Sequence, residues 1–176
     1  METLHLAGFE SPIGPLRVLS TNGGVVYLEL PHANGRGLAG WLSRQAPGAK
    51  TVEAFAPNRT AITQVLEYLE GKRTHFTLPL DLRGTRFQQA VWGELLRIPY
   101  GETRSYQAIA QAIGEPGASR AVGGANGANP VALIVPCHRV VASHGLGGYG
   151  GGLALKRHLL ALERNRLATP KQGRLL

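Results

Sequence analysis

Residues 136–141 read Pro-Cys-His-Arg-Val-Val and follow an apolar run over residues 131–135 that predicts a buried strand. Cys137 is the only cysteine of the 176-residue chain, and His138 stands directly beside it. A thiol is nucleophilic only as the thiolate, so a lone cysteine becomes chemically interesting when a neighbour can remove its proton. The alternative interpretation of Cys137 is a small buried hydrophobe at the end of the strand.

The composition indicates a globular protein with a reduced thiol. Hydrophobic residues make up 43% of the chain, which is enough for a packed core. A single cysteine excludes an internal disulfide and a zinc site built from several thiolates. The first residues show neither a basic segment nor a long apolar one, so export and membrane insertion are not indicated. We therefore expect a cytoplasmic protein.

Positive charge gathers in the second part of the chain. The net charge is +8, and residues 1–102 hold ten basic and nine acidic residues, whereas residues 103–176 hold nine basic and two acidic ones. A one-sided basic surface favours binding to a phosphate backbone, because each neutralised phosphate releases counterions. The alternative is a solubilising basic tail. It would comprise Arg164, Arg166, Lys171 and Arg174.

The first 80 or so residues predict a small α/β unit. Apolar runs indicate three antiparallel strands at residues 4–10, 16–20 and 25–30, and helical spacing indicates helices at residues 38–44 and 60–70. Thr21-Asn22-Gly23-Gly24 supplies residues suited to a hairpin turn. No side chain here carries visible chemistry, so we interpret this part as a scaffold that ends near Asp81-Leu82-Arg83-Gly84.

The second part predicts consecutive helices in a basic domain, which suggests a helix-turn-helix. Thr85 and Gln88 form a capping box, and Ser105 can cap the next helix. The helices are expected from Thr85 to Arg97, from Ser105 to Gly114, from Ser119 to Ala125 and from Leu153 to Glu163, with a turn at residues 126–130.

The helix from Ser119 has an unusual composition for one that reads the major groove. Residues 120–125 read Arg-Ala-Val-Gly-Gly-Ala, and glycines lower helix stability. Small residues suit a backbone that must come close to a ligand, and Arg120 suits a probe. We therefore predict contact with the minor groove of DNA. Close packing against the core would explain the small residues but not Arg120.

A glycine-rich loop, residues 145–152, holds six glycines in eight residues. It lacks the Gly-Lys-Ser/Thr ending of a P-loop. We predict a thin wall that exposes backbone N–H groups to a planar ligand.

Five motifs together resemble the O6-alkylguanine-DNA alkyltransferase family. They are residues 136–140, residues 120–125, Asn129-Pro130, Ser105-Tyr106 and residues 151–154. The resemblance is close over residues 85–163 and holds in outline over the N-terminal half. It implies an α+β fold, in which an N-terminal ribonuclease H-like α/β domain, residues 1–82, precedes a C-terminal winged-helix-like helix-turn-helix domain, residues 83–176.

The resemblance also implies a reaction. Family members flip a damaged guanine out of duplex DNA and transfer the alkyl group from its O6 atom to a cysteine. A desolvated thiolate suits attack on saturated carbon, and a stacked base cannot be reached without extrusion. By resemblance, Cys137 accepts the alkyl group, His138 deprotonates it through a water, and Glu163 orients the imidazole. Because a thioether does not release its methyl group, each protein acts once; activity on O4 of thymine stays open.

The remaining roles carry over by position. Tyr106 would hydrogen-bond the flipped guanine, Arg120 would fill the vacated space, and Asn129 would brace the active-site turn. The DNA-binding set comprises Ala118, Ser119, Arg120, Gly123 and Gly124, and the substrate pocket comprises Tyr106, Val140, Tyr149 and Gly150. Family members often have Asn-Tyr-Ser-Gly where residues 148–151 read Gly-Tyr-Gly-Gly, so one side-chain hydroxyl contact is lost.

Two other functions fit parts of the sequence. A DNA-binding module without transfer activity, as in alkyltransferase-like proteins, would replace the cysteine, but Cys137 is present. A cysteine hydrolase would have no use for Arg120 or the basic half. The expected partner is double-stranded DNA containing O6-alkylguanine, bound through the minor groove by a monomer that could assemble on DNA. No cofactor is expected, nor the zinc that some relatives bind through cysteines.

Overall fold

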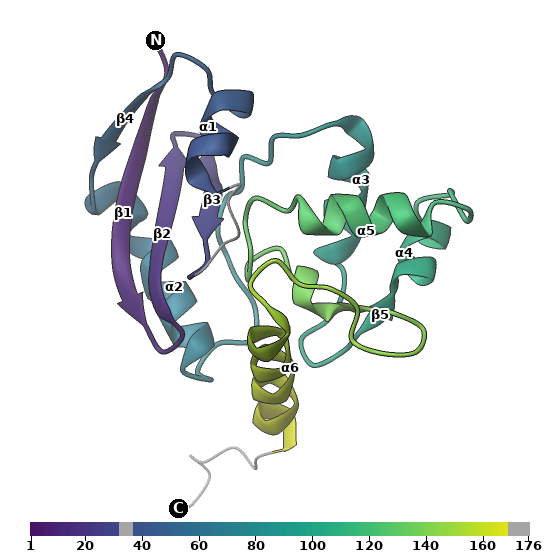
Figure 1. Cartoon of the computed structure of the whole chain (residues 1–176). Helices are drawn as coiled ribbons and strands as arrows, with labels where there is room; N and C mark the ends of the chain where they lie inside the picture. Colours follow the sequence, from purple (N-terminus) through teal and green to yellow (C-terminus); the bar gives the residue numbers. More distant parts are fainter. Residues whose placement is uncertain (32–36, 169–176) are drawn as a thin grey trace, which may run out of the picture.

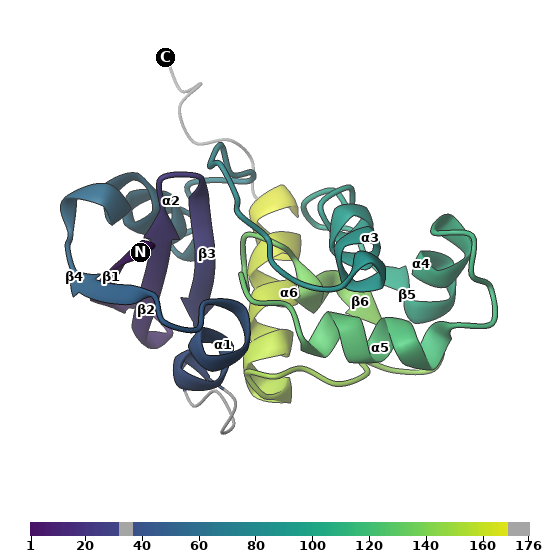
Figure 2. The same ribbon diagram turned by 90° about the horizontal axis from the view of Figure 1, so that it is seen from above.

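A computed structural model describes residues 1–31 and 37–168 (Figure 1). Lys171 and Arg174 of the predicted basic tail lie outside the described residues. A sheet with two helices forms the N-terminal half, and short helices form most of the C-terminal half (Figures 1 and 2). Among the described residues, no helix is both long and apolar enough to cross a bilayer.

The N-terminal sheet has four strands in the order β3-β2-β1-β4. The strands are β1 (Thr3–Ser11), β2 (Gly14–Thr21), β3 (Gly24–Glu29) and β4 (Lys50–Glu53). The three predicted antiparallel strands are confirmed, and Thr21 pairs with Gly24 across the predicted hairpin turn. The sequence did not reveal β4, which pairs parallel to β1, because its side chains show no buried alternation.

Two helices cover this sheet and confirm the predicted ones. They are α1 (Leu38–Gln45) and α2 (Arg59–Leu69), and the 3₁₀ turn η1 (Ala56–Asn58) precedes α2. Trp41 of α1 packs with Leu4 and Leu19 in a small core. Tyr68 of α2 belongs to the larger core, which includes Val18 on the same strand as Leu19. Alternate residues of β2 therefore point to different helices, as the period of a strand requires.

The described part of the C-terminal half, up to residue 168, contains four α-helices, with Cys137 in a 3₁₀ turn between two of them. These elements are α3 (Arg86–Leu95), β5 (Arg104–Ser105), α4 (Tyr106–Ala112), α5 (Ser119–Gly127), η2 (Cys137–Arg139), β6 (Val140–Val141) and α6 (Leu153–Ala168). The capping box is confirmed, because Thr85 and Gln88 exchange both expected hydrogen bonds. Ser105 caps α4 by accepting a hydrogen bond from Ala108 N, 3.0 Å away.

The turn was predicted to begin at residue 126, but α5 continues to Gly127, so the turn begins after that residue. Helix propensity alone would end a helix near its glycines, but tertiary packing holds this one. The indole of Trp92 in α3 donates a hydrogen bond to Ala125 O at 2.8 Å, and Val122 is fully buried. The small residues of α5 therefore do serve packing on one side of the helix.

The strand predicted over residues 131–135 is wrong, although its residues are buried as expected. Val135 N donates to Val131 O at 2.9 Å, which folds the segment back on itself. Leu133 has a positive φ of 70°, a backbone conformation rare outside glycine. Asn129 braces the turn at both ends, since its side chain accepts from Val131 N and donates to Val135 O. A compact turn therefore delivers the chain to Cys137.

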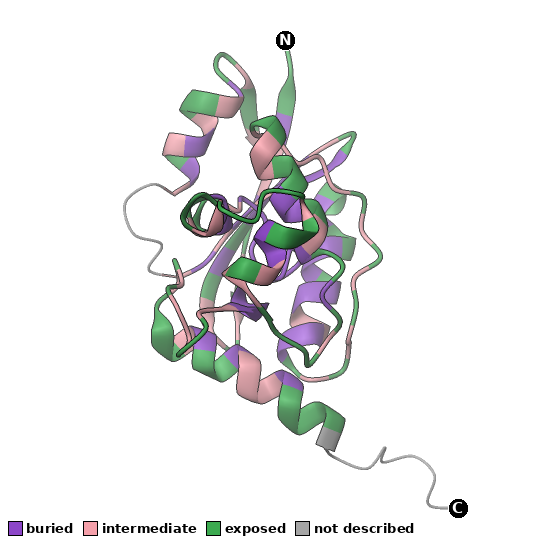
Figure 3. Ribbon diagram, turned by 90° about the vertical axis from the view of Figure 1, so that its right-hand side faces the viewer, coloured by how far each residue is buried: buried purple, intermediate pink, exposed green. Residues whose placement is uncertain are grey.

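Helix α6 lies between the sheet and the helices of the C-terminal half (Figures 1 and 2). Only a narrow stripe of it is buried (Figure 3). The sequence predicts Leu155, Leu159 and Leu162 at this stripe, but only Leu159 is fully buried and the other two are half-buried. Lys156 and Glu163 complete the buried stripe. Two charged side chains thus occupy positions where a helix normally buries apolar ones.

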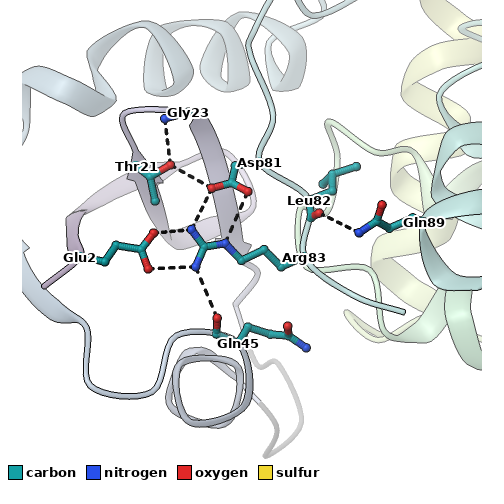
Figure 4. A network of polar contacts seen from close by, with 8 residues as sticks. All are labelled: Glu2, Thr21, Gly23, Gln45, Asp81, Leu82, Arg83 and Gln89. Carbon is teal, nitrogen blue, oxygen red and sulfur yellow. Dashed lines mark hydrogen bonds and ion pairs between the residues drawn. The ribbon is translucent and has the colours of Figure 1, made fainter. Parts of the chain in front are cut away.

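The predicted junction at residues 81–84 is tied to the N-terminal sheet by a polar network (Figure 4). The guanidinium of Arg83 pairs with Asp81 at 2.9 Å and with both carboxylate oxygens of Glu2. Arg83 also donates to Gln45 O, and the Thr21 hydroxyl donates to Asp81 at 3.0 Å. A bidentate pair within a network is worth more than isolated surface pairs. The chain therefore passes from one half to the other along a fixed path.

Gly24 offers a test of this path. Its φ is +137°, and a Cβ there would lie 2.4 Å from Pro79 O, which accepts a hydrogen bond from Val25 N. We expect Gly24→Ala to lower the free energy of unfolding by more than about 2 kcal/mol, because backbone must move. Gly48→Ala, at φ +77° with nothing within 4 Å, should cost about 1 kcal/mol. Denaturant unfolding measures both, and equal losses would contradict this.

Candidate active site

Cys137 lies at a cavity of about 260 Å³ whose walls come from both halves of the chain. The C-terminal half contributes predicted residues, namely Tyr106, Gly123, Asn129, Tyr149 and Gly150. The sheet side contributes Tyr27, Leu28 and Leu30, which the sequence did not mark. The half of the chain interpreted as a scaffold thus also contributes to the wall of the cavity.

Cys137 is 6% exposed, and its backbone is held from two sides. Asn126 donates its side-chain amide to Cys137 O at 3.2 Å, and Asn129 secures the preceding turn. Burial raises the pKa of the Cys137 thiol, while the Asn129 side chain and the positive charge of Lys156 act in the opposite direction. The thiol is consequently protonated at neutral pH until a base takes its proton.

The candidate base is His138, which is completely buried. Its Nε2 lies 2.6 Å from Glu163 Oε2. An unprotonated nitrogen at this distance from a carboxylate would be repelled, so we assign the proton to Nε2. Nδ1 makes no hydrogen bond to any described residue. Burial lowers the pKa of His138 and the Glu163 carboxylate raises it, with burial prevailing, so the imidazole is neutral and its Nδ1 can accept a proton.

Glu163 is the polar centre of this arrangement. Its Oε1 accepts hydrogen bonds from Gly101 N and from Arg139 Nε, both at 2.9 Å. Its Oε2 accepts from His138, from Arg139 Nη2 at 3.1 Å and from the Tyr68 hydroxyl at 2.6 Å. Burial alone would raise the pKa of this carboxyl, but His138 and Arg139 outweigh it and lower the pKa to about 2. Glu163 is therefore ionised.

Lys156 is a buried cation to which the sequence analysis gave no role. Its Nζ donates to the carbonyls of Val140, Leu146 and Gly148, with distances of 2.6 Å to Val140 and 3.0 Å to Gly148. This single group ties the glycine-rich loop to β6 and to α6. Burial lowers the pKa of Lys156. The predicted pocket residue Val140 is not among those lining the cavity; its side chain is buried and its carbonyl binds Lys156.

The predicted DNA-binding residues lie along α5, from the residue before its first turn to Gly124. Arg120 is exposed and has no ion-pair partner among the described residues. With Ser119, Gly123 and Tyr106 it lines a second, shallower hollow next to the cavity. A Cβ at Gly124 would meet nothing within 4 Å, so packing does not require this glycine. Ala118 is the residue before the first turn of the helix.

Tyr68, Arg139 and Lys156 carried no recognisable signal of their own. Arg139 was visible only as part of the motif after Cys137, and Lys156 reads as an ordinary helical lysine. Tyr68 falls in the spacing of a helix buried against the sheet. Their polar ends meet the site through contacts that span up to 95 residues of sequence. Such contacts follow from the tertiary fold and leave no local pattern.

Comparison with known proteins covers both halves of the chain. Residues 86–165 match the family described as "6-O-methylguanine DNA methyltransferase, DNA binding domain", and residues 4–82 match "6-O-methylguanine DNA methyltransferase, ribonuclease-like domain". The chain is 47% identical in sequence to the methylated-DNA–protein-cysteine methyltransferase of Mycobacterium leprae and 49% identical to that of Mycobacterium bovis. These alignments cover 94% and 93% of this chain, and 96% and 94% of the relatives.

The solved structures agree. The crystal structure of Mycobacterium tuberculosis OGT in complex with DNA is similar with a TM-score of 0.78 and 47% identity, over 92% of this chain and 94% of that one. The α+β fold, with its ribonuclease-like and DNA-binding parts, is thereby confirmed. Because the similarity extends through both halves, the chain belongs to the methylated-DNA–protein-cysteine methyltransferase family.

Proposed function

We propose that this protein repairs DNA by transferring an alkyl group from O6 of guanine to the sulfur of Cys137. One observation carries the proposal: a buried thiol lies at a cavity, next to a neutral histidine whose proton on Nε2 is held by an ionised carboxylate. The relatives named methylated-DNA–protein-cysteine methyltransferases support the same reaction. The protein is then an enzyme of single turnover.

The step is a substitution at saturated carbon. His138 Nδ1 takes the thiol proton through a water, and Glu163 holds the resulting imidazolium. The thiolate forms a carbon–sulfur bond while the carbon–oxygen bond breaks, and the electron pair leaves on the guanine oxygen. The positive charge of Lys156 favours the thiolate in this buried setting. The product is a thioether, which does not return the alkyl group.

The remaining residues bind and orient the guanine. Tyr106, at the first position of α4 and at the cavity wall, donates a hydrogen bond to the flipped base and stabilises its charge as it leaves. Tyr149 and Gly150 of the glycine-rich loop also line the cavity. Asn129 braces the turn that carries the thiol.

Duplex DNA reaches the site through its minor groove. Arg120 enters the base stack where the guanine has left, and the small residues of α5 let the backbone approach. The backbone-approach set is Ala118, Ser119, Gly123 and Gly124. The relative from M. tuberculosis was solved with DNA, which supports this partner. The protein acts as a monomer that can assemble on DNA.

Two further proposals concern the domain boundaries and the cellular compartment of the protein. The N-terminal domain comprises residues 1–82 and the C-terminal domain residues 83–176, a division supported by the matched ranges 4–82 and 86–165. The protein works in the cytoplasm, because the reaction requires Cys137 as a free thiol and that compartment keeps thiols reduced.

Transfer is tested by mixing the protein with duplex DNA that contains O6-methylguanine and mapping peptides by mass spectrometry. We expect one methyl group per protein, on Cys137, with guanine restored in the DNA. Cys137→Ser should bind the duplex without any transfer. Binding without an adduct on the unaltered protein would contradict transfer and favour the non-catalytic alkyltransferase-like module. Repeated turnover would contradict the acceptor role.

Arg120→Ala separates base extrusion from chemistry. Because the arginine acts on the duplex, transfer from O6-methylguanine in duplex DNA should slow by roughly tenfold or more, a loss of about 1.4 kcal/mol in the barrier. Transfer from free O6-benzylguanine should be unchanged. Arg164→Ala, which removes an equal exposed charge from α6, is the matched control. Equal losses on both substrates, or equal losses in both variants, would contradict the role of Arg120.

A further inference from the structure

The phenol of Tyr68 reaches the proposed catalytic groups from the other half of the chain. Tyr68 lies on α2, is completely buried and packs its ring against Phe76 and Tyr100, with ring centroids 5.4 Å and 6.2 Å away. Its hydroxyl lies 2.6 Å from Glu163 Oε2 and 3.1 Å from His138 Nε2. Nothing in the transfer step described above uses this group.

Besides Arg139 Nη2, two donors approach the same carboxylate oxygen closely. His138 Nε2–H and the Tyr68 hydroxyl both approach Glu163 Oε2 at 2.6 Å. Burial and the neighbouring Glu163 raise the pKa of Tyr68 well above its usual value, so the hydroxyl keeps its proton and donates it. Each hydrogen bond accepted by a carboxylate spreads its charge and weakens its pull on the other donors.

We propose that Tyr68 is a positioning residue for alkyl transfer: by sharing Glu163 Oε2 with His138, its hydroxyl fixes the imidazole ring and limits how strongly the carboxylate favours the imidazolium. The inference rests on the proposed function. This role would make the N-terminal half part of the proton-transfer site, because Tyr68, which lowers the basicity of His138, comes from α2.

The charged and titratable groups around His138 decide the direction of the expected effect. They are Tyr68 from α2, Cys137 and Arg139 from η2, Tyr149 from the glycine-rich loop, and Lys156 and Glu163 from α6. Among them Glu163 is the group that favours the protonated ring through a hydrogen bond, while Arg139 and Lys156 disfavour it. Removing the Tyr68 hydroxyl leaves Glu163 with one donor fewer, so its attraction for a proton on His138 increases. The pKa of His138 then rises.

The test uses the variant Tyr68→Phe with free O6-benzylguanine as the substrate. The rate of benzyl transfer to the protein is measured as a function of pH between about pH 5 and 9. A base acts only when neutral, so a higher pKa of His138 moves the acid limb of the profile to higher pH. We expect a displacement of about one pH unit relative to the unaltered protein. Phenylalanine keeps the ring and its packing, and circular dichroism over the same range confirms that each variant is folded.

Tyr100→Phe is the matched control. The Tyr100 hydroxyl is buried without a hydrogen-bond partner among the described residues, and its ring packs edge-on against Tyr68. Its profile should superimpose on that of the unaltered protein. A Tyr68→Phe profile that superimposes as well, an equal displacement in both variants, or an unaltered protein that transfers without an acid limb would each overturn the inference. An unaltered protein that transfers nothing would instead refute the proposed function.

Discussion

The ionised carboxylate of Glu163 is the group on which the site depends. A buried charge is tolerated only where hydrogen bonds and counter-charges offset its lost hydration. Here five hydrogen bonds converge on the two oxygens, from four residues that belong to α2, to η2 and to the turn before β5. Satisfying this one group requires the helix α6, the segment that carries Cys137 and the N-terminal half to lie together. The group that orients the proposed base therefore also binds the two halves of the protein to one another.

Lys156 fixes the loop at the cavity wall through hydrogen bonds, just as Glu163 fixes the proposed base. Residues 145–152 have few side chains that could pack against the core. The ammonium group of Lys156 nevertheless binds the carbonyls of Leu146 and Gly148 in this loop and that of Val140 in β6. Both side chains project from the same stripe of α6, separated by Leu159. One helix thus presents a cation to the pocket loop and an anion to the imidazole, two turns apart. Polar contacts from one helix thus help to position both the proposed base and the glycine-rich loop.

Local signals in the sequence were reliable wherever the structure is local. The Thr85 capping box, the Ser105 cap and the Thr21–Gly24 hairpin each depend on residues within four positions, and each is confirmed. The apolar run before Cys137 is buried as predicted, yet it is a turn, because Asn129 binds the backbone at both of its ends and Val135 N donates to Val131 O within it. The roles of Tyr68 and Lys156 could not be predicted. Helical spacing indicates which side chains are buried, but it does not indicate which polar atoms their hydroxyl or ammonium groups will contact. The Cys137–His138 pair could be singled out from the sequence, and Glu163 and Asn129 through the family resemblance, whereas Tyr68 and Lys156 could not.

The central claim is that Glu163 holds a neutral His138 with its proton on Nε2 and leaves Nδ1 to act as the base. Nitrogen-15 NMR of the imidazole at neutral pH measures this directly, with His138→Gln used to assign its signals among the six histidines. The account predicts a protonated Nε2 and an unprotonated Nδ1. A proton on Nδ1 alone, or a doubly protonated ring, would contradict it.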